Sequence, residues 1–192
     1  MKQTLMIHEW DNEFYNMGDI LEKYILTFDD GLYSQYEALE FLKTLKTVKI
    51  FFVSTDIIRP VEVAPSRQFI KCADAHKKAF DGNLENYMNW EEIMEIHNTQ
   101  NCIIGGHGHR HIKTWKIESL RNKHPIIEED AAMMIFNFNN EGIEINRFCY
   151  PYNYEDPIYS AILKKYHGIE KFYNGDRIAI EDLIEELKKE EK

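Results

Sequence analysis

Three histidines occupy alternate positions directly after a short apolar run in the stretch CIIGGHGHRHIKTW, residues 102–115. Imidazole nitrogens are common ligands of divalent transition metals. The interspersed glycines favour a loop over a helix, and alternate residues of an extended segment cannot all face one ion. The spacing therefore predicts His107 and His111 as metal ligands, with His109 turned elsewhere. The alternative for this segment is a solvated polar loop.

A pair of aspartates, Asp29 and Asp30, follows the apolar run YILTF. Two histidines and one carboxylate are a common three-ligand set for a catalytic divalent ion and leave one coordination position open. One aspartate can bind the ion while the other accepts a proton from a water whose pKa the metal lowers to about 7. Because Asp-Asp-Gly is also a good turn sequence, a plain turn is the alternative. Zinc is the first choice for this ligand set, although cobalt, nickel, iron or manganese would also fit.

The segments that must position these groups are apolar runs of strand length alternating with segments of helical period. Strands are predicted over 4–8, 24–30, 48–54, 102–106 and 147–152. Helices are predicted over 34–45, 89–100, from Pro125 to the residue before Gly142, over 155–168, and over 181–192. Asn89 and Glu92 form a capping box at the start of the second of these helices. Residues 60–88 suggest long loops or a short helix.

This alternation predicts the α/β class, with a mostly parallel sheet closed or partly closed as a barrel. Four of the apolar runs end in reactive or turn-forming residues, which are His8, Asp29 with Asp30, the segment 107–111, and Pro151 with Tyr152. The carboxyl ends of parallel strands meet at one rim of such a sheet. These residues are therefore expected to form one active site.

Composition limits the class of protein and of partner. The 192 residues, with 44% hydrophobic and 29% charged positions, suit a single globular domain over 1–192. A net charge of −10 disfavours binding to nucleic acid or to an anionic membrane surface. No signal peptide or membrane-spanning stretch is recognisable, and the three cysteines have no paired spacing, so a cytoplasmic protein with reduced thiols is expected.

Three of these motifs together resemble a known family. LTFDDG (26–31), HGHRH (107–111) and RFCYPY (147–152) are similar, in this order, to the first three motifs of the NodB-like polysaccharide deacetylases, carbohydrate esterase family 4. The resemblance implies a distorted, incomplete (β/α) barrel. It also implies a metal-dependent hydrolase that removes an acetyl group from an N-acetylated sugar or oligosaccharide.

The resemblance also implies roles for individual residues. Asp29 would be the general base, and Asp30 would bind the metal with His107 and His111. Arg147 would orient the base, and the backbone N–H of Tyr152 would bind the oxyanion. A fixed cation near Asp29 would keep that carboxylate ionised, and a backbone donor beside the metal is what a tetrahedral oxyanion requires.

The sequence departs from the family pattern in two places. Gly108 stands where the second motif has serine or threonine, and the later motifs, including a C-terminal L-x-H histidine, have no counterpart after residue 152. LMIH (5–8) resembles such an L-x-H strand, as in the circularly permuted branch of the family, the poly-N-acetylglucosamine deacetylases. His8 is therefore predicted to be the general acid, the alternative being a histidine that merely ends a surface strand.

Other candidates concern the substrate. Trp115, four residues after His111, is predicted at the rim of the cleft as a sugar-stacking residue, with Tyr152 also expected to contact the substrate. His76, His97 and His124 lie in polar contexts and are expected to be solvated. Two other functions stay open: an amidase acting on a small non-sugar amide, and a non-catalytic domain that keeps the metal and binds a ligand.

Overall fold

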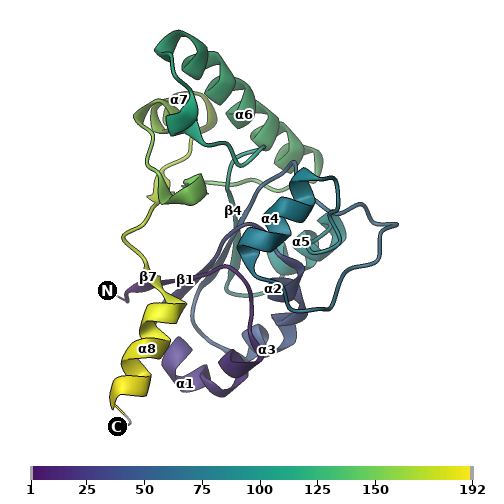
Figure 1. Cartoon of the computed structure of the whole chain (residues 1–192), viewed down its shortest axis with the longest axis vertical. Coiled ribbons are helices and arrows are strands. Elements are labelled where there is room, and N and C mark those ends of the chain that lie inside the picture. The colour runs from purple at the N-terminus through teal and green to yellow at the C-terminus, as the bar shows by residue number, and fades with distance from the viewer. Residues whose placement is uncertain (1, 191–192) are drawn as a thin grey trace.

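The computed structural model of the protein describes residues 2–190. Within this range seven strands form one sheet in the order β6-β5-β4-β3-β2-β1-β7, and every neighbouring pair is parallel. Figure 1 shows β1 and β7 side by side at one edge of this sheet. The strands are β1 (Thr4–Ile7), β2 (Ile25–Phe28), β3 (Lys49–Val53), β4 (Cys102–Gly106), β5 (Arg147–Cys149), β6 (Lys171–Tyr173) and β7 (Ile178–Ala179).

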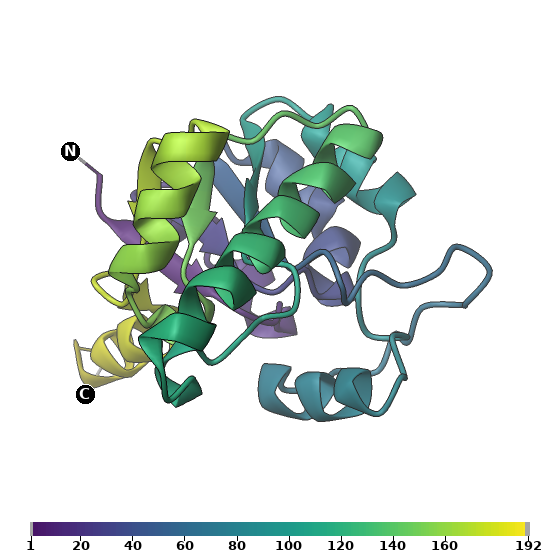
Figure 2. The ribbon, with the colours of Figure 1, turned by 90° about the horizontal axis from the view of Figure 1, so that it is seen from above.

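The α-helices of the described chain are α1 (Gly18–Leu21), α2 (Tyr33–Glu37), α3 (Leu39–Thr44), α4 (Cys72–Phe80), α5 (Trp90–His97), α6 (Leu120–Asn140), α7 (Pro157–His167) and α8 (Ile180–Glu190). Short 3-10 turns are η1 (Asn12–Asn16), η2 (Thr114–Lys116) and η3 (Pro151–Asn153). The long helix α6 packs against α7, and the last helix, α8, contacts the first strand, β1 (Figures 1 and 2). No helix within 2–190 is long and apolar enough to cross a bilayer.

The two edge strands of the sheet, β6 and β7, are consecutive in the chain, and the sheet curls without closing between them. This is the distorted, incomplete (β/α) barrel that the sequence predicts. β1 lies between β2 and β7, so the last strand of the described chain is a neighbour of the first. The single domain predicted over 1–192 stays a prediction, and its first residue and last two residues lie outside the described range.

Both faces of the sheet are covered by apolar side chains. All five residues of β3 are buried, which explains why this strand appears in the sequence as a continuous apolar run. On one face Phe28 stacks on Phe51 with ring centroids 4.5 Å apart, within the main core. On the other face Ile50, Phe52 and Cys149 form a smaller cluster. Burying a phenylalanine side chain contributes about 1.5–3 kcal/mol.

Most predicted elements are present, with boundaries that shift for local reasons. The capping box of α5 is confirmed, with Glu92 N donating to Asn89 Oδ1 at 2.9 Å and Asn89 N donating to Glu92 Oε2 at 2.8 Å. Gly168 ends α7 in a left-handed conformation, as predicted. The helix predicted over 34–45 is instead two short helices that meet at Ala38.

The prediction for Pro125 is wrong. α6 begins at Leu120, and Ser119 caps it by accepting a hydrogen bond from the Asn122 N–H at 3.2 Å. Pro125 lies inside the helix, where its missing N–H removes one backbone hydrogen bond. The side-chain cap at Ser119 moves the start of the helix toward the amino terminus.

Residues 60–88, predicted to be long loops or a short helix, contain α4 between two extended stretches, set apart from the other helices in Figure 2. The apolar side of α4 is held by a small cluster in which Ala75 and Ala79 pack with Leu32 and Tyr87. A backbone bridge between Leu32 and Tyr87 fixes the same region. The helix therefore has its own core beside the sheet.

Candidate metal and catalytic site

The predicted residues at the strand ends meet in one pocket of about 290 Å³. Its lining comes from the ends of β1, β2 and β4, from the turn after β5, and from α4, and comprises His8, Asp29, Asp30, Cys72, Ala73, His76, His107, His111, Tyr152 and Asn153. The meeting at one rim follows from the parallel register, in which Ile7 lies beside Phe28 and Val53 beside Gly106.

Asp30, His107 and His111 converge as a ligand triad. Asp30 Oδ1 lies 3.2 Å from His107 Nε2 and 3.1 Å from His111 Nε2, and the two imidazole nitrogens are 3.2 Å apart. Oxygen and nitrogen ligands at about 2.0–2.1 Å from a tetrahedral ion are separated by about 3.3 Å. Asp30 Oδ1 is buried and, among the described residues, has no hydrogen-bond partner. The triad therefore fits a divalent metal ion.

The surroundings of the two histidines suit the same purpose. His107 Nδ1 lies 2.8 Å from the carbonyl oxygen of Cys149, so its N–H can donate there and leave Nε2 free for an ion. Burial alone would lower the pKa of His107, but Cys149 and Asp30 raise it well above its usual value, so binding of an ion must displace a proton from this imidazole. Burial lowers the pKa of His111 to about 4, which keeps its imidazole neutral at pH 7. Burial alone would raise the pKa of Asp30, but the surrounding histidines lower it well below its usual value.

Strained backbone is concentrated at this pocket. Four of the five non-glycine residues with positive φ in the described chain line it, namely Asp30 (74°), His111 (50°), Tyr152 (59°) and Asn153 (56°). Each such conformation costs about 1–3 kcal/mol and persists only where the surrounding structure enforces it. The concentration of strain favours a functional site over a simple polar loop.

Asp29 is 2% exposed and is held by an arginine that the sequence did not indicate. Arg177 Nη1 donates to Asp29 Oδ1 at 2.7 Å, and Nη2 donates to Oδ2 at 2.6 Å. Burial alone would raise the pKa of Asp29, but the Arg177 guanidinium lowers it below its usual value. The same guanidinium donates to Thr27 Oγ1 at 3.0 Å and to Asn153 Oδ1 at 2.9 Å. Arg177 therefore joins β2, the β5 turn and β7.

The role predicted for Arg147 is wrong. Arg147 is the first residue of β5, whereas Asp29 follows the last residue of β2. Because the strands are parallel, the two residues lie at opposite ends of the strands. Its Nε donates to Asn146 Oδ1 at 3.0 Å, and its side chain lines a different hollow beside His97 and Glu144. Arg177, immediately before β7, occupies the position that the motif assigned to Arg147.

His8 lies at the rim beside Asp29. The Asp29 N–H donates to the carbonyl oxygen of Ile7 at 3.0 Å, which places the residue after β1 next to the residue after β2. The Gln35 amide donates to the carbonyl oxygens of His8 and Asp29, at 2.6 Å each. One buried side chain therefore joins the ends of both strands, and the imidazole of His8 lines the same pocket as the metal triad.

The histidine loop is braced without the hydroxyl of the family motif. Asp130, fully buried on α6, accepts hydrogen bonds from the backbone N–H groups of His109 and Arg110, at 2.9 Å each, and another from the Tyr159 hydroxyl. Gly108 has φ +79°, and a Cβ there would lie 3.1 Å from Asp130 Oδ2. His109 turns away from the triad, as predicted, with Nδ1 2.9 Å from Thr55 Oγ1.

Aromatic side chains pack around Tyr152, which lines the pocket. Trp115, 41% exposed, meets Tyr152 edge to face at 5.2 Å and Tyr154 at 5.0 Å between ring centroids. The Tyr152 ring lies 4.4 Å from that of His111. Trp10 and Trp90 instead pack into the core. Trp115 therefore contacts the ring that contacts His111, and it offers an exposed aromatic surface there.

The sequence prediction for His76 is also wrong. His76 is buried, and its Nε2 lies 3.2 Å from Asp30 Oδ1. Cys72, one helical turn earlier, donates its S–H to Asp30 Oδ2 at 3.0 Å. By contrast, His124 is exposed and His97 is partly buried away from the triad. In the sequence, only the four-residue spacing of Cys72 and His76 could have indicated that they lie together on a helix. The surrounding residues have no helical period, so this spacing did not stand out.

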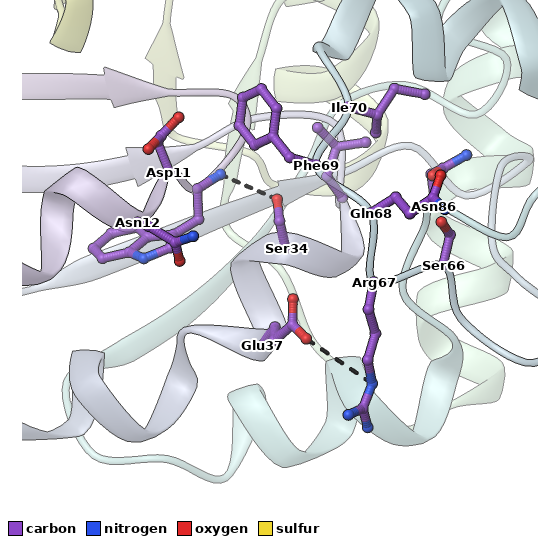
Figure 3. Close-up of a pocket in the computed structure, with 12 residues that line it drawn as sticks. Asp11, Asn12, Ser34, Glu37, Ser66, Arg67, Gln68, Phe69, Ile70 and Asn86 are labelled. Carbon is purple, nitrogen blue, oxygen red and sulfur yellow. Dashed lines mark hydrogen bonds and ion pairs between the residues drawn. The ribbon is translucent and has the colours of Figure 1, made fainter.

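A second hollow, of about 310 Å³, lies between the loop after β1 and residues 66–70 (Figure 3). Trp10 N donates to Ser34 Oγ at 3.0 Å along one wall, and Arg67 Nε lies 4.0 Å from Glu37 Oε1 at the other. None of the residues that line this hollow belongs to the triad or to the Asp29–Arg177 pair. It is therefore separate from the candidate active site.

Comparisons with known proteins show the fold. The sequence matches no established sequence family and no curated protein. The structure is similar to that of IcaB from Ammonifex degensii, with TM-score 0.67, 19% identity, and 92% and 90% of the two chains covered. It is also similar to the deacetylase domain of BpsB from Bordetella bronchiseptica, with TM-score 0.64, 12% identity, and 93% and 94% covered.

A polysaccharide deacetylase from Bacillus cereus is a third similar structure, with TM-score 0.60, 14% identity, and 95% of this chain and 67% of that chain covered. At these identities the likeness establishes the fold. The resemblance of the three sequence motifs to NodB-like deacetylases is thus confirmed at the level of the fold, while the circularly permuted arrangement stays a prediction.

Proposed function

We propose that this protein is a metal-dependent hydrolase that removes an acetyl group from an N-acetylated sugar or oligosaccharide. The observation that carries the proposal is the meeting of a buried ligand triad with a separately held carboxylate in one pocket. Two of the similar structures are named as deacetylases, and one of these as a polysaccharide deacetylase. The motif resemblance points to the same reaction.

Asp30, His107 and His111 would hold the ion, and zinc is the first choice for their oxygen and nitrogen ligands. A divalent ion in this position would polarise the acetyl carbonyl and acidify water. The cytoplasmic location expected from the sequence stays part of this proposal.

Asp29 would act as the general base. A carboxylate has about four acceptor positions. Arg177 uses one on each oxygen and the Cys149 S–H uses a second on Oδ2, so a position on Oδ1 remains for a proton. Arg177 also keeps Asp29 ionised, because the guanidinium stabilises its charged form. Two adjacent aspartates thus take different roles, with Asp29 facing arginine and Asp30 facing histidines.

His8 would act as the general acid that protonates the leaving amine, since it lines the pocket and lies beside Asp29. The backbone N–H of Tyr152 would donate to the developing oxyanion. Trp115 and the ring of Tyr152 would contact the sugar, because they present aromatic surface at the pocket mouth.

Acetate release from a panel of N-acetylated sugars and oligosaccharides tests this function. Zinc-loaded protein is expected to release acetate, and chelation is expected to abolish the release. An Asp29→Asn protein that keeps its metal is expected to be inactive, which separates loss of the base from loss of the ion. A protein that binds its metal and releases no acetate from any sugar would refute the proposal and favour an amidase or a binding domain.

A further inference from the structure

A second group of metal-ligating side chains converges on Asp30 from a different element. α4 carries Cys72 and His76, which are four residues apart and therefore lie on one side of the helix. His76 Nε2 is 3.2 Å from Asp30 Oδ1, and Cys72 Sγ is 3.0 Å from Asp30 Oδ2. The proposed function uses neither side chain.

His76 has the surroundings of a metal ligand. It is 9% exposed, and its Nδ1 lies 3.2 Å from the hydroxyl of Tyr87, a fully buried residue. Metal-binding histidines are commonly oriented in this way through the ring nitrogen that does not bind. Its Nε2 is buried and, within residues 2–190, has no hydrogen-bond partner. A buried polar atom without a partner is unfavourable, and a bound cation would supply that partner.

Contacts with other residues also fix the position of α4. Glu9 accepts a hydrogen bond from the backbone N–H of Cys72 at 3.1 Å and forms an ion pair with Lys71 at 2.7 Å. On the same face of the helix Ala75 and Ala79 pack into the cluster with Leu32 and Tyr87, and Cys72 packs against that cluster. These contacts add to those with Asp30 in holding Cys72 and His76 over the carboxylate.

We propose that Asp30, Cys72 and His76 form a second divalent-metal site, with Asp30 bridging this ion and the ion held by His107 and His111. The ligand atoms of each triad lie within 4.8 Å of one another, and the two triads share only Asp30. The imidazoles of both triads approach Asp30 Oδ1, and Cys72 approaches Oδ2, so one carboxylate would serve both ions. Paired ions in enzymes lie about 3.5–4 Å apart.

The donor set predicts the chemistry of this second site. Thiolate, imidazole and carboxylate together favour zinc or cobalt over magnesium or calcium. Binding requires the Cys72 thiol to lose its proton, which passes to solvent as the sulfur–metal bond forms. An ion held by these ligands would attach α4 to the end of β2, beside the pocket mouth.

Cobalt(II) titration of the metal-free full-length protein tests the proposal, because cobalt reports both the number of ions and the presence of sulfur. Equilibrium dialysis with metal analysis is expected to find two ions per chain, with a thiolate-to-cobalt charge-transfer band in the near ultraviolet. Cys72→Ser is expected to lose the band, and His76→Ala and His76→Gln to bind one ion. Cys102→Ser and the exposed His124→Ala serve as matched controls and should keep both ions and the band. Circular dichroism confirms the fold of each variant.

One ion per chain in the unaltered protein would overturn the second site, as would a second ion that persists in both His76 variants. Either result leaves the proposed deacetylase function intact. A different result would refute the first site, formed with His107 and His111. In that case His107→Ala and His111→Ala would change neither the number of bound ions nor their affinity.

Discussion

Arg177 donates hydrogen bonds to both oxygens of the Asp29 carboxylate, with Nη1 2.7 Å from Oδ1 and Nη2 2.6 Å from Oδ2. Both residues are buried. Parallel hydrogen bonds of this kind fix the orientation of a carboxylate as well as its charge. The orientation of the proposed base is therefore set by a residue from the far end of the chain.

Arg177→Gln is expected to lower kcat for deacetylation by about 10²-fold or more, because general-base catalysis contributes about 10²–10⁴. Loss of the guanidinium also raises the pKa of Asp29, so the acid limb of the kcat/KM profile should move to higher pH. Arg147→Gln is the control and should keep both turnover and profile. Identical pH profiles of kcat/KM for Arg177→Gln and Arg147→Gln would contradict the role of Arg177 in keeping Asp29 ionised.

The same ion pair should make stability depend on pH. Asp29 has a lowered pKa in the folded protein, so the stabilisation by Arg177 is present above the ordinary value of 3.8 and is lost as pH falls through the folded-state pKa. Breaking a buried pair costs about 3–5 kcal/mol. Urea unfolding should show this difference in the free energy of unfolding between the unaltered protein and Arg177→Gln at pH 7. The difference should become smaller toward pH 3. A difference that stays constant across this range would contradict the prediction.

His8→Ala is expected to reduce kcat on N-acetylated sugars by about 10²–10⁴-fold, the usual contribution of a general acid, with little change in metal affinity. Steady-state kinetics together with metal analysis of the purified variant measures both quantities. His124→Ala, which removes an exposed histidine, is the control. Near-full turnover in His8→Ala would assign the proton donor to another group.

Gly108→Ser, which restores the hydroxyl of the family motif, is expected to destabilise this protein. The residue has φ +79°, and its Cβ would crowd Asp130 Oδ2 at 3.1 Å. Gly142→Ser is the matched control, since Gly142 has φ +73° with no atom within 4 Å of an added Cβ. Strained backbone alone costs about 1–3 kcal/mol, so both substitutions should lower the free energy of unfolding. Urea unfolding should show a larger decrease for Gly108→Ser than for Gly142→Ser. Equal decreases would show that Asp130 can move away from the added side chain.

Trp115→Ala is expected to raise KM for N-acetylated oligosaccharides about 2- to 10-fold while kcat and metal affinity stay unchanged, because aromatic stacking is worth about 0.5–1.5 kcal/mol. Phe136→Ala removes another exposed aromatic side chain, on α6, and should leave KM unaltered. An equal change in KM in the two variants would contradict a role for Trp115 in substrate binding.

The parts of the site that could be predicted are local in the chain. Asp29, Asp30 and the histidines follow apolar runs directly, and strands of a parallel sheet bring their ends together whatever the connections between them. The fold class follows from the same alternation of apolar runs and helical periods. Both the fold and the convergence of the proposed ligands were accessible from these patterns.

The residues that were missed reach the pocket from segments without a recognisable pattern. Arg177 precedes a strand of two residues, too short to show periodicity. Asp130 lies within the charged stretch of α6, where an aspartate suggests a solvated face. His76 lies in an irregular segment whose packing depends on Tyr87 and Leu32. Only the tertiary structure brings these side chains to the carboxylates and the histidine loop.

The distance along the chain between Asp29 and Arg177 has a consequence for biosynthesis. The two residues are 148 positions apart. At about 5–20 residues per second, a ribosome adds the arginine roughly 7–30 seconds after the aspartate. Throughout that interval the aspartate has no guanidinium partner, and the sheet lacks β7 beside β1. A nascent chain therefore cannot form the Asp29–Arg177 pair before nearly all of the sheet has been synthesised, so the activity proposed for this site would arise late and as a unit.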